Sequence, residues 1–81
     1  MEQDTNTYST RDLYFASYLL ATGHNLLDIF FDESGRFSWF QFESDVSHCE
    51  EQDRLFQTNK LSVKAKDFVE SIKFLKRKVT Q

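Results

Sequence analysis

Three side chains of this sequence belong to the types that catalysis and metal binding use most often: His24, His48 and Cys49. A histidine can act as a base or as a metal ligand, and a helix N-terminus can lower the pKa of a thiol. His48 and Cys49 are adjacent on a predicted helix, so their side chains point in different directions. Neither histidine has a ligand partner at a suitable spacing, and we expect the two histidines to be isolated from each other. We therefore predict no catalytic residue, no metal and no cofactor, with Cys49 as a small core thiol.

Carboxylates are the next group that could do chemistry, because paired carboxylates bind metal ions or exchange protons. Nothing in their spacing fixes a pair, so we interpret them as a solvated acidic surface. The alternative is mimicry of nucleic-acid phosphates, with the carboxylates facing a basic groove on another protein. The predicted acidic surface consists of Asp12, Asp28, Asp32, Glu43, Asp45, Glu50, Glu51 and Asp53.

Charge divides the chain into two parts. Residues 1–59 hold three basic and eleven acidic side chains, whereas residues 60–81 hold seven basic and two acidic ones. An acidic body disfavours non-specific nucleic-acid binding, which depends on neutralising phosphates. We interpret the cations of the basic segment as compensating the negative C-terminal end of a helix dipole. The alternative is that they contact nucleic-acid phosphates. Besides Lys60, the cations of this segment are Lys64, Lys66, Lys73, Lys76, Arg77 and Lys78, the last four forming the predicted basic surface.

The bulk composition limits how so short a chain can be stabilised. A chain of 81 residues buries about 60% of the surface that its unfolded form exposes. A single cysteine offers no disulfide, so oligomerisation is the remaining common means of stabilisation. The polar first residues lack the layout of a signal peptide, and no apolar run reaches the roughly 20 residues of a membrane helix. We expect a cytoplasmic protein of the host cell.

A short hairpin with two apolar faces is the most informative element to predict. Two apolar runs, 26–31 and 37–42, flank a turn at 32–35 in which Gly35 can adopt a positive φ. A half-buried strand should instead alternate apolar and polar residues. One predicted face carries Leu27, Ile29, Phe31, Phe40 and Phe42, and the other carries Leu26, Phe30, Phe37 and Trp39.

Helical patterns flank this hairpin on both sides. Capping boxes are predicted at Ser9 with Asp12 and at Ser47 with Glu50. The first helix should end at Gly23, the second should cover 47–58 and stop at Asn59, and the last should cover 64–80. Residues 60–63 would form a short edge strand or an extended link. The predicted fold is a single α+β domain over 9–80 in the order α-β-β-α-(β)-α, following a frayed segment 1–8.

The apolar side chains exceed what one small core requires. The first helix is apolar nearly all round, which indicates that it is covered nearly all round. Aromatic residues on a sheet can also stack on bases, but the predicted neighbours here are mostly acidic and only Arg36 is positive. We therefore predict burial by protein, through the domain's own helices or a second subunit. The predicted interface is either the helix face with Tyr14 and Tyr18 or the sheet face with Phe30, Phe37 and Trp39.

Several segments together resemble a small uncharacterised family of unknown function. They are the runs STRDLYFASYLLATGHNLLDI, DESGR, WFQFES and VKAKDFVESIKFLKRKV. The shared pattern falls on Thr10 to Tyr14, Gly23-His24, Gly35-Arg36, Phe40 to Phe42 and Lys66 to Lys78. Members of that family are short proteins of bacteria, archaea, phages and plasmids. The resemblance implies a mobile-element setting and carries no assigned activity.

These observations favour a non-enzymatic protein-interaction module of a phage or mobile element that forms a homodimer. One alternative is an anti-CRISPR protein or another host-defence inhibitor that acts by acidic mimicry of nucleic acid on a host effector complex. The other is a nucleic-acid accessory protein that uses the basic C-terminal helix. No membrane partner is expected.

Overall fold

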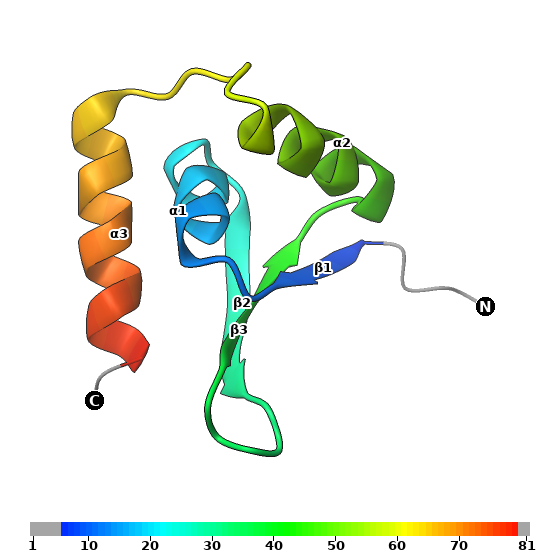
Figure 1. Ribbon diagram of the computed structural model, residues 1–81, viewed down its shortest axis with the longest axis vertical. Coiled ribbons are helices and arrows are strands. Elements are labelled where there is room, and N and C mark those ends of the chain that lie inside the picture. Colours follow the sequence, from blue (N-terminus) through cyan, green and yellow to red (C-terminus); the bar gives the residue numbers. More distant parts are fainter. Residues whose placement is uncertain (1–5, 80–81) are drawn as a thin grey trace.

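A three-stranded antiparallel sheet and three helices make up the computed structural model, which describes residues 6–79 (Figure 1). The strand order in the sheet is β1-β3-β2, so the last strand of the chain lies in the centre. The α+β class, the three helices and the β2–β3 hairpin are confirmed. The elements are β1 (Thr7–Thr10), α1 (Leu13–Ala21), β2 (Asn25–Phe31), β3 (Ser38–Glu43), α2 (Val46–Gln57) and α3 (Ala65–Val79).

The third strand lies at the beginning of the chain and not between the last two helices. Thr7–Thr10 pairs with β3, placing Tyr8 opposite Phe42 and Thr10 opposite Phe40. The predicted frayed segment 1–8 is therefore wrong for its last two residues, while residues 1–5 lie outside the described part. Of the two alternatives for 60–63, the edge strand is wrong and the link is right, since these residues connect α2 and α3 without regular structure. Four residues are too few for a strand pattern to stand out without knowledge of the partner strand.

Aspartates, and not the predicted serines, begin the first two helices. The Asp12 carboxylate accepts hydrogen bonds from the backbone N–H groups of Tyr14 and Phe15, and Asp45 accepts one from His48. Both capping-box predictions are wrong because Ser9 belongs to β1 and Ser47 lies inside α2. A carboxylate at the cap satisfies the free N–H groups of the first turn and also suits the helix dipole.

Both predicted helix stops are confirmed. Gly23 has a φ of 96°, and the following residue, His24, donates its N–H to the carbonyl oxygen of Leu19 at 3.0 Å. This is the Schellman arrangement, which needs a left-handed residue just after the helix. Asn59, with a φ of 62°, ends α2 in the same way.

A bulge in β2 changes which side chains face the core. Leu26 pairs with Phe42 and Ile29 pairs with Phe40, and the register shifts at Leu27, between Leu26 and Asp28. Because one inserted residue reverses the alternation of a strand, Leu26 joins the core face and Leu27 turns outward. The predicted placement of these two leucines on the hairpin faces is therefore wrong.

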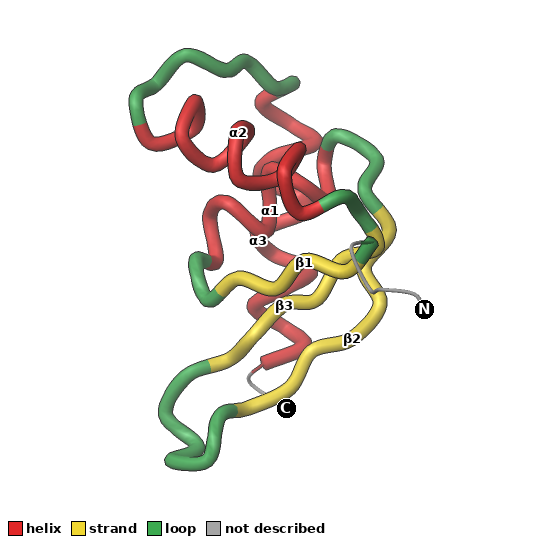
Figure 2. Tube along the Cα trace, turned by 90° about the vertical axis from the view of Figure 1, so that its right-hand side faces the viewer, coloured by secondary structure: helices red, strands yellow, loops and turns green. Residues whose placement is uncertain are grey.

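The core forms where all three helices meet the Phe40 and Phe42 face of the sheet. Helix α1 supplies half of the eight buried core residues, and Leu75 of α3 and Cys49 of α2 complete the core from two further directions. The loop between β2 and β3 lies at the end of the molecule away from α2 (Figure 2). The base of the hairpin is therefore covered by helices, whereas its far end projects from them.

Candidate functional site

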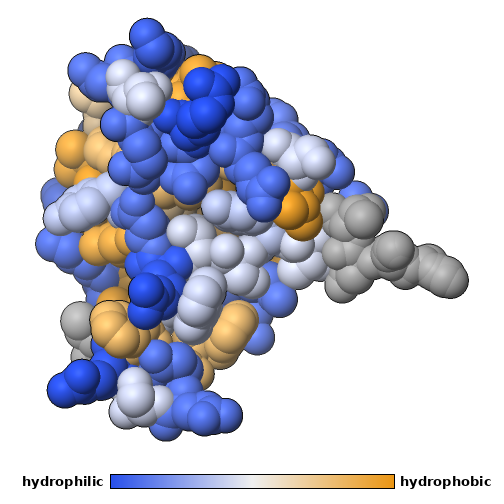
Figure 3. Space-filling model, turned by 45° about the vertical axis from the view of Figure 1, so that its right-hand side comes forward, coloured by the Kyte–Doolittle hydropathy of each residue, from blue (hydrophilic) through white to orange (hydrophobic). Residues whose placement is uncertain are grey.

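The projecting end of the hairpin carries most of the exposed apolar surface. We define the hairpin arm as residues 27–39. Among residues 6–79, six large apolar side chains are exposed, and four of these lie on the arm with exposed fractions of 38% to 55%. Apolar patches next to hydrophilic side chains are visible on the lower part of the molecule in Figure 3. The four exposed residues of the arm are Leu27, Phe30, Phe31 and Phe37.

One face of the arm carries an aromatic cluster that the guanidinium group of Arg11 contacts. The rings of Phe30 and Trp39 lie 6.5 Å apart with an interplanar angle of 11°. The Arg11 guanidinium carbon lies 4.4 Å from the centroid of the Phe37 ring and 5.7 Å from that of Trp39. Cation–π contact of this kind adds about 0.5–1 kcal/mol at exposed sites. Sequence reasoning missed Arg11, which reaches this face because the preceding residue pairs with β3.

A groove of about 300 Å³ follows the outer edge of β2. The Asp28 carboxylate accepts a hydrogen bond from the backbone N–H of Ile29 at 2.8 Å. This amide is therefore engaged, and a bulge lies beside it, so the edge is poorly suited to pairing with an added strand. The groove is lined by Leu26, Leu27, Asp28, Ile29, Phe31 and Lys78.

The two tyrosines predicted to share an interface lie in different environments. Tyr18 is buried, donates its hydroxyl hydrogen to Oε1 of Gln52 at 2.9 Å and packs 5.7 Å from the Phe56 ring. Burial raises the pKa of Tyr18. Tyr14 is 52% exposed. Of this pair, only Tyr14 is accessible to a second chain.

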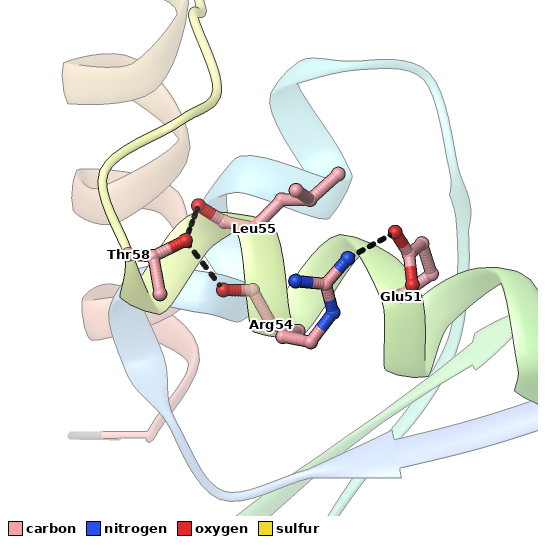
Figure 4. A network of polar contacts seen from close by, with 4 residues as sticks. All are labelled: Glu51, Arg54, Leu55 and Thr58. Carbon is pink, nitrogen blue, oxygen red and sulfur yellow. Dashed lines mark hydrogen bonds and ion pairs between the residues drawn. The ribbon is translucent and has the colours of Figure 1, made fainter.

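The predicted acidic residues lie on several elements. On α2, Gln57 donates hydrogen bonds to Asp12 at 3.0 Å and to Asp53 at 3.1 Å, which joins the start of α1 to α2. The Arg54 guanidinium donates a 2.6 Å bond to Glu51, while the Thr58 hydroxyl at the helix end donates to the backbone carbonyl oxygen of Arg54 (Figure 4). The exposed Glu50 lies on the same helix.

The other acidic residues accept hydrogen bonds within the β2–β3 hairpin or next to it. Asp32 accepts a 2.7 Å hydrogen bond from the Ser34 hydroxyl, and this bond is the main reason that the pKa of Asp32 is lowered. Glu43 accepts a 3.1 Å bond from the Asn25 side chain. The carboxylates of Asp28 and Asp45 accept hydrogen bonds from backbone N–H groups, as described above. Seven of the eight predicted acidic residues therefore accept a hydrogen bond within the described fold.

Tyr8 lies next to the acidic side chains of α2. Partial burial, followed by the negative charge of Asp53, raises the pKa of Tyr8 to about 12. Glu50 and Asp12 act in the same direction. The fold therefore disfavours the ionised form of this phenol.

We expect the raised pKa of Tyr8 to make the stability of the fold fall at alkaline pH. The ordinary pKa of tyrosine is about 10, so the Tyr8 contribution to stability is complete below pH 10 and is lost as the pH rises towards about 12. Denaturant unfolding at pH 9 and pH 11 should show a smaller loss of stability in Tyr8→Phe than in the native chain. Tyr18 contributes in the same direction, so the variant should remove only part of the loss. An identical loss in both chains would contradict the assignment.

The basic surface occupies the C-terminal half of α3. Lys73, Lys76, Arg77 and Lys78 are all exposed. The Lys78 ammonium lies 5.3 Å from the centroid of the Phe74 ring and borders the β2 groove, where Asp28 also lies. These cations complement the negative end of the helix, as predicted from the sequence.

Cys49 is a core thiol, as predicted. It is completely buried, and burial is the main reason that the pKa of its thiol is raised. A raised thiol pKa disfavours the thiolate, which is the nucleophilic form.

The histidines are not isolated, so that prediction is wrong. The Nε2 atoms of His24 and His48 lie 3.3 Å apart. Asn25 pairs with Glu43 in the sheet, which brings the residue before β2 next to the segment after β3. Recognising this register would have revealed the pair. Among residues 6–79, no group of three or more histidine, cysteine or acidic side chains is arranged to hold a metal ion.

Comparisons with known proteins do not extend this picture. No family model matches the chain, and neither the curated proteins nor the solved structures contain a match. The family resemblance therefore stays a prediction. No helix within residues 6–79 has both the length and the apolar character needed to cross a membrane.

Proposed function

We propose that this chain is a non-enzymatic protein-interaction module that forms a homodimer through the hairpin arm. The observation that carries the proposal is the concentration of exposed large apolar side chains on the arm, where four of the six in the described part lie. Exposed apolar patches rimmed by polar residues are typical of protein-binding surfaces.

The size of this apolar surface supports a second copy as the occupant. A fully covered aromatic side chain buries roughly 200 Å². At exposed fractions of 38% to 55%, the four side chains would together bury about 350 Å² on association. A stable interface needs roughly 800 Å² from each partner, and homodimer interfaces are about 65% apolar. The arm would therefore supply most of the apolar centre of such an interface, with Trp39 adding to it.

The charges of the arm also match a second copy. A twofold axis presents the same patch on both subunits, so the patch must complement itself. Arg11 lies on the aromatic face and Arg36 in the turn, while the same turn carries Asp32 and Glu33. Two copies packed in opposite directions can place the arginines of one against the carboxylates of the other. Packing of side chains from both faces of the arm, rather than strand addition, fits an edge on which Asp28 engages the Ile29 amide.

Light scattering and sedimentation over a concentration series test this proposal. The native chain should be a dimer at micromolar concentration. The double variant Phe30→Ser with Phe37→Ser should weaken the dimer at least about 100-fold, because central aromatic anchors carry most of the energy of an interface. Circular dichroism would verify that the variant folds.

Val69→Ser provides the matched control. Val69 is 45% exposed and lies on α3, outside the arm. This variant should leave the dimer unchanged. A native chain that stays monomeric at high micromolar concentration would contradict the proposal, as would equal weakening by the control.

A further inference from the structure

We propose that His24 and His48 together form a binding site for a divalent transition-metal ion of the Zn²⁺ class, with two coordination positions left open. Their Nε2 atoms are 3.3 Å apart. The ring planes are inclined by 19° and the centroids are 5.4 Å apart. Because the centroids lie farther apart than the nitrogen atoms, the rings meet through their Nε2 edges and not face to face.

The hydrogen bonds of His24 leave its Nε2 atom as the ligand. Its Nδ1 atom lies 3.1 Å from the carbonyl oxygen of Leu19 and 3.2 Å from the Thr22 hydroxyl oxygen. A carbonyl can only accept a hydrogen bond, so Nδ1 carries the hydrogen and Nε2 of the neutral ring carries a lone pair. Histidine ligands in metal sites commonly donate the other ring N–H to a backbone carbonyl in this way.

The distance between the two nitrogen atoms suits a shared ion. Two Zn–N bonds of about 2.05 Å that end on atoms 3.3 Å apart enclose roughly 107°, close to the tetrahedral angle. Without metal, one hydrogen between the two Nε2 atoms makes an N–H···N bond. With metal, the neutral His48 ring carries its hydrogen on Nδ1, and both Nε2 lone pairs face the ion. Imidazole ligands favour zinc, copper and nickel over magnesium or calcium.

The backbone around both ligands is held in place. His24 follows the left-handed Gly23 at the end of α1, and its own N–H is bonded to Leu19. His48 lies in the first turn of α2, and its N–H is bonded to Asp45. The pairing of Asn25 with Glu43 connects the two segments through the sheet. A bound ion would therefore link α1 and β2 to α2.

This site is independent of the proposed dimer surface. The histidines flank one end of β2, and the hairpin turn lies at the other end of the same strand. Binding of Zn²⁺ can thus succeed or fail whatever the oligomeric state of the chain.

Calorimetric titration with Zn²⁺ alone is the direct test. We expect one ion per chain in the native protein, with affinity weakened at least about tenfold in His24→Gln and in His48→Gln. Two matched controls, Cys49→Ala and Glu50→Gln, remove the neighbouring thiol and carboxylate and should bind as the native chain does. Zn²⁺ should also raise the melting temperature of the native chain and of the controls, but not that of the histidine variants.

Two results would overturn the proposal. One is no binding to the native chain at millimolar Zn²⁺. The other is binding that the histidine variants retain while they remain folded by circular dichroism. Electron paramagnetic resonance with Cu²⁺ as the probe provides a second readout, since coupling to two imidazole nitrogens is expected in the native chain and to one in either variant.

Discussion

Phe15→Ala should lower the free energy of unfolding by about 3–5 kcal/mol. Phe15 is completely buried on α1. Its ring lies 6.1 Å from Tyr8, 6.1 Å from Tyr18 and 5.5 Å from Phe56. These partners belong to β1, α1 and α2, so the substitution opens a cavity where three elements meet. Globular domains have about 0.05–0.15 kcal/mol of stability per residue, so the loss is a large part of the roughly 4–12 kcal/mol expected for 81 residues.

Urea unfolding followed by circular dichroism measures this effect. Tyr14→Ala is the matched control, because Tyr14 precedes Phe15 on the same helix and is 52% exposed. The control should change the free energy of unfolding by no more than about 1 kcal/mol. A loss below about 1 kcal/mol in Phe15→Ala would show that this ring is not at the centre of the core.

Local signals made much of the fold predictable. The hairpin and the helix stops at Gly23 and Asn59 depend on residues close in sequence, whose conformational preferences act before any tertiary contact forms. The amphipathic period of the last helix likewise identified the start of α3 within one residue, while its predicted last residue, 80, lies outside the described part of the chain. In each case the physical cause is contained in a few consecutive residues.

Features that depend on strand pairing could not be predicted in this way. Strand β1 exists because β3 offers it an edge, and the bulge beside Leu27 depends on how β2 meets β3. That bulge moved Leu26 to the core face, which no reading of β2 alone would show. The cap at Asp12 follows from β1, because the strand occupies the residues that a capping box would have used.

The candidate sites likewise include features that local sequence predicts and features that depend on strand pairing. The exposure of Phe30 and Phe37 was predictable because a hairpin with two apolar faces exceeds one small core. The presence of Arg11 on that face was not, nor was the contact between His24 and His48. Both depend on the register that β3 makes with its two neighbours. The pairing of β3 with β1 and β2 brings together residues that are distant in sequence. No pattern of neighbouring residues in the sequence indicates such a contact.

The second large effect is expected from Leu75, which anchors α3. Leu75 is completely buried, whereas the link between α2 and α3 has no regular structure. Helix α3 packs mainly on α1 and has only Ser71 as a second buried residue. Leu75→Ala should therefore lower the free energy of unfolding by about 2–5 kcal/mol and loosen α3 before the rest of the fold.

Hydrogen exchange resolved by residue distinguishes loosening of α3 from a uniform loss of stability. In Leu75→Ala, protection should fall more over α3 than over β3, since the helix depends on this contact while the central strand is paired on both edges. Val69→Ala, on the exposed side of the same helix, should leave protection and unfolding within about 1 kcal/mol of the native chain. Equal loss of protection in α3 and β3 would show that the helix and the sheet unfold as one unit. The groove beside β2 would then be as stable as the core, because Lys78 of α3 forms one of its walls.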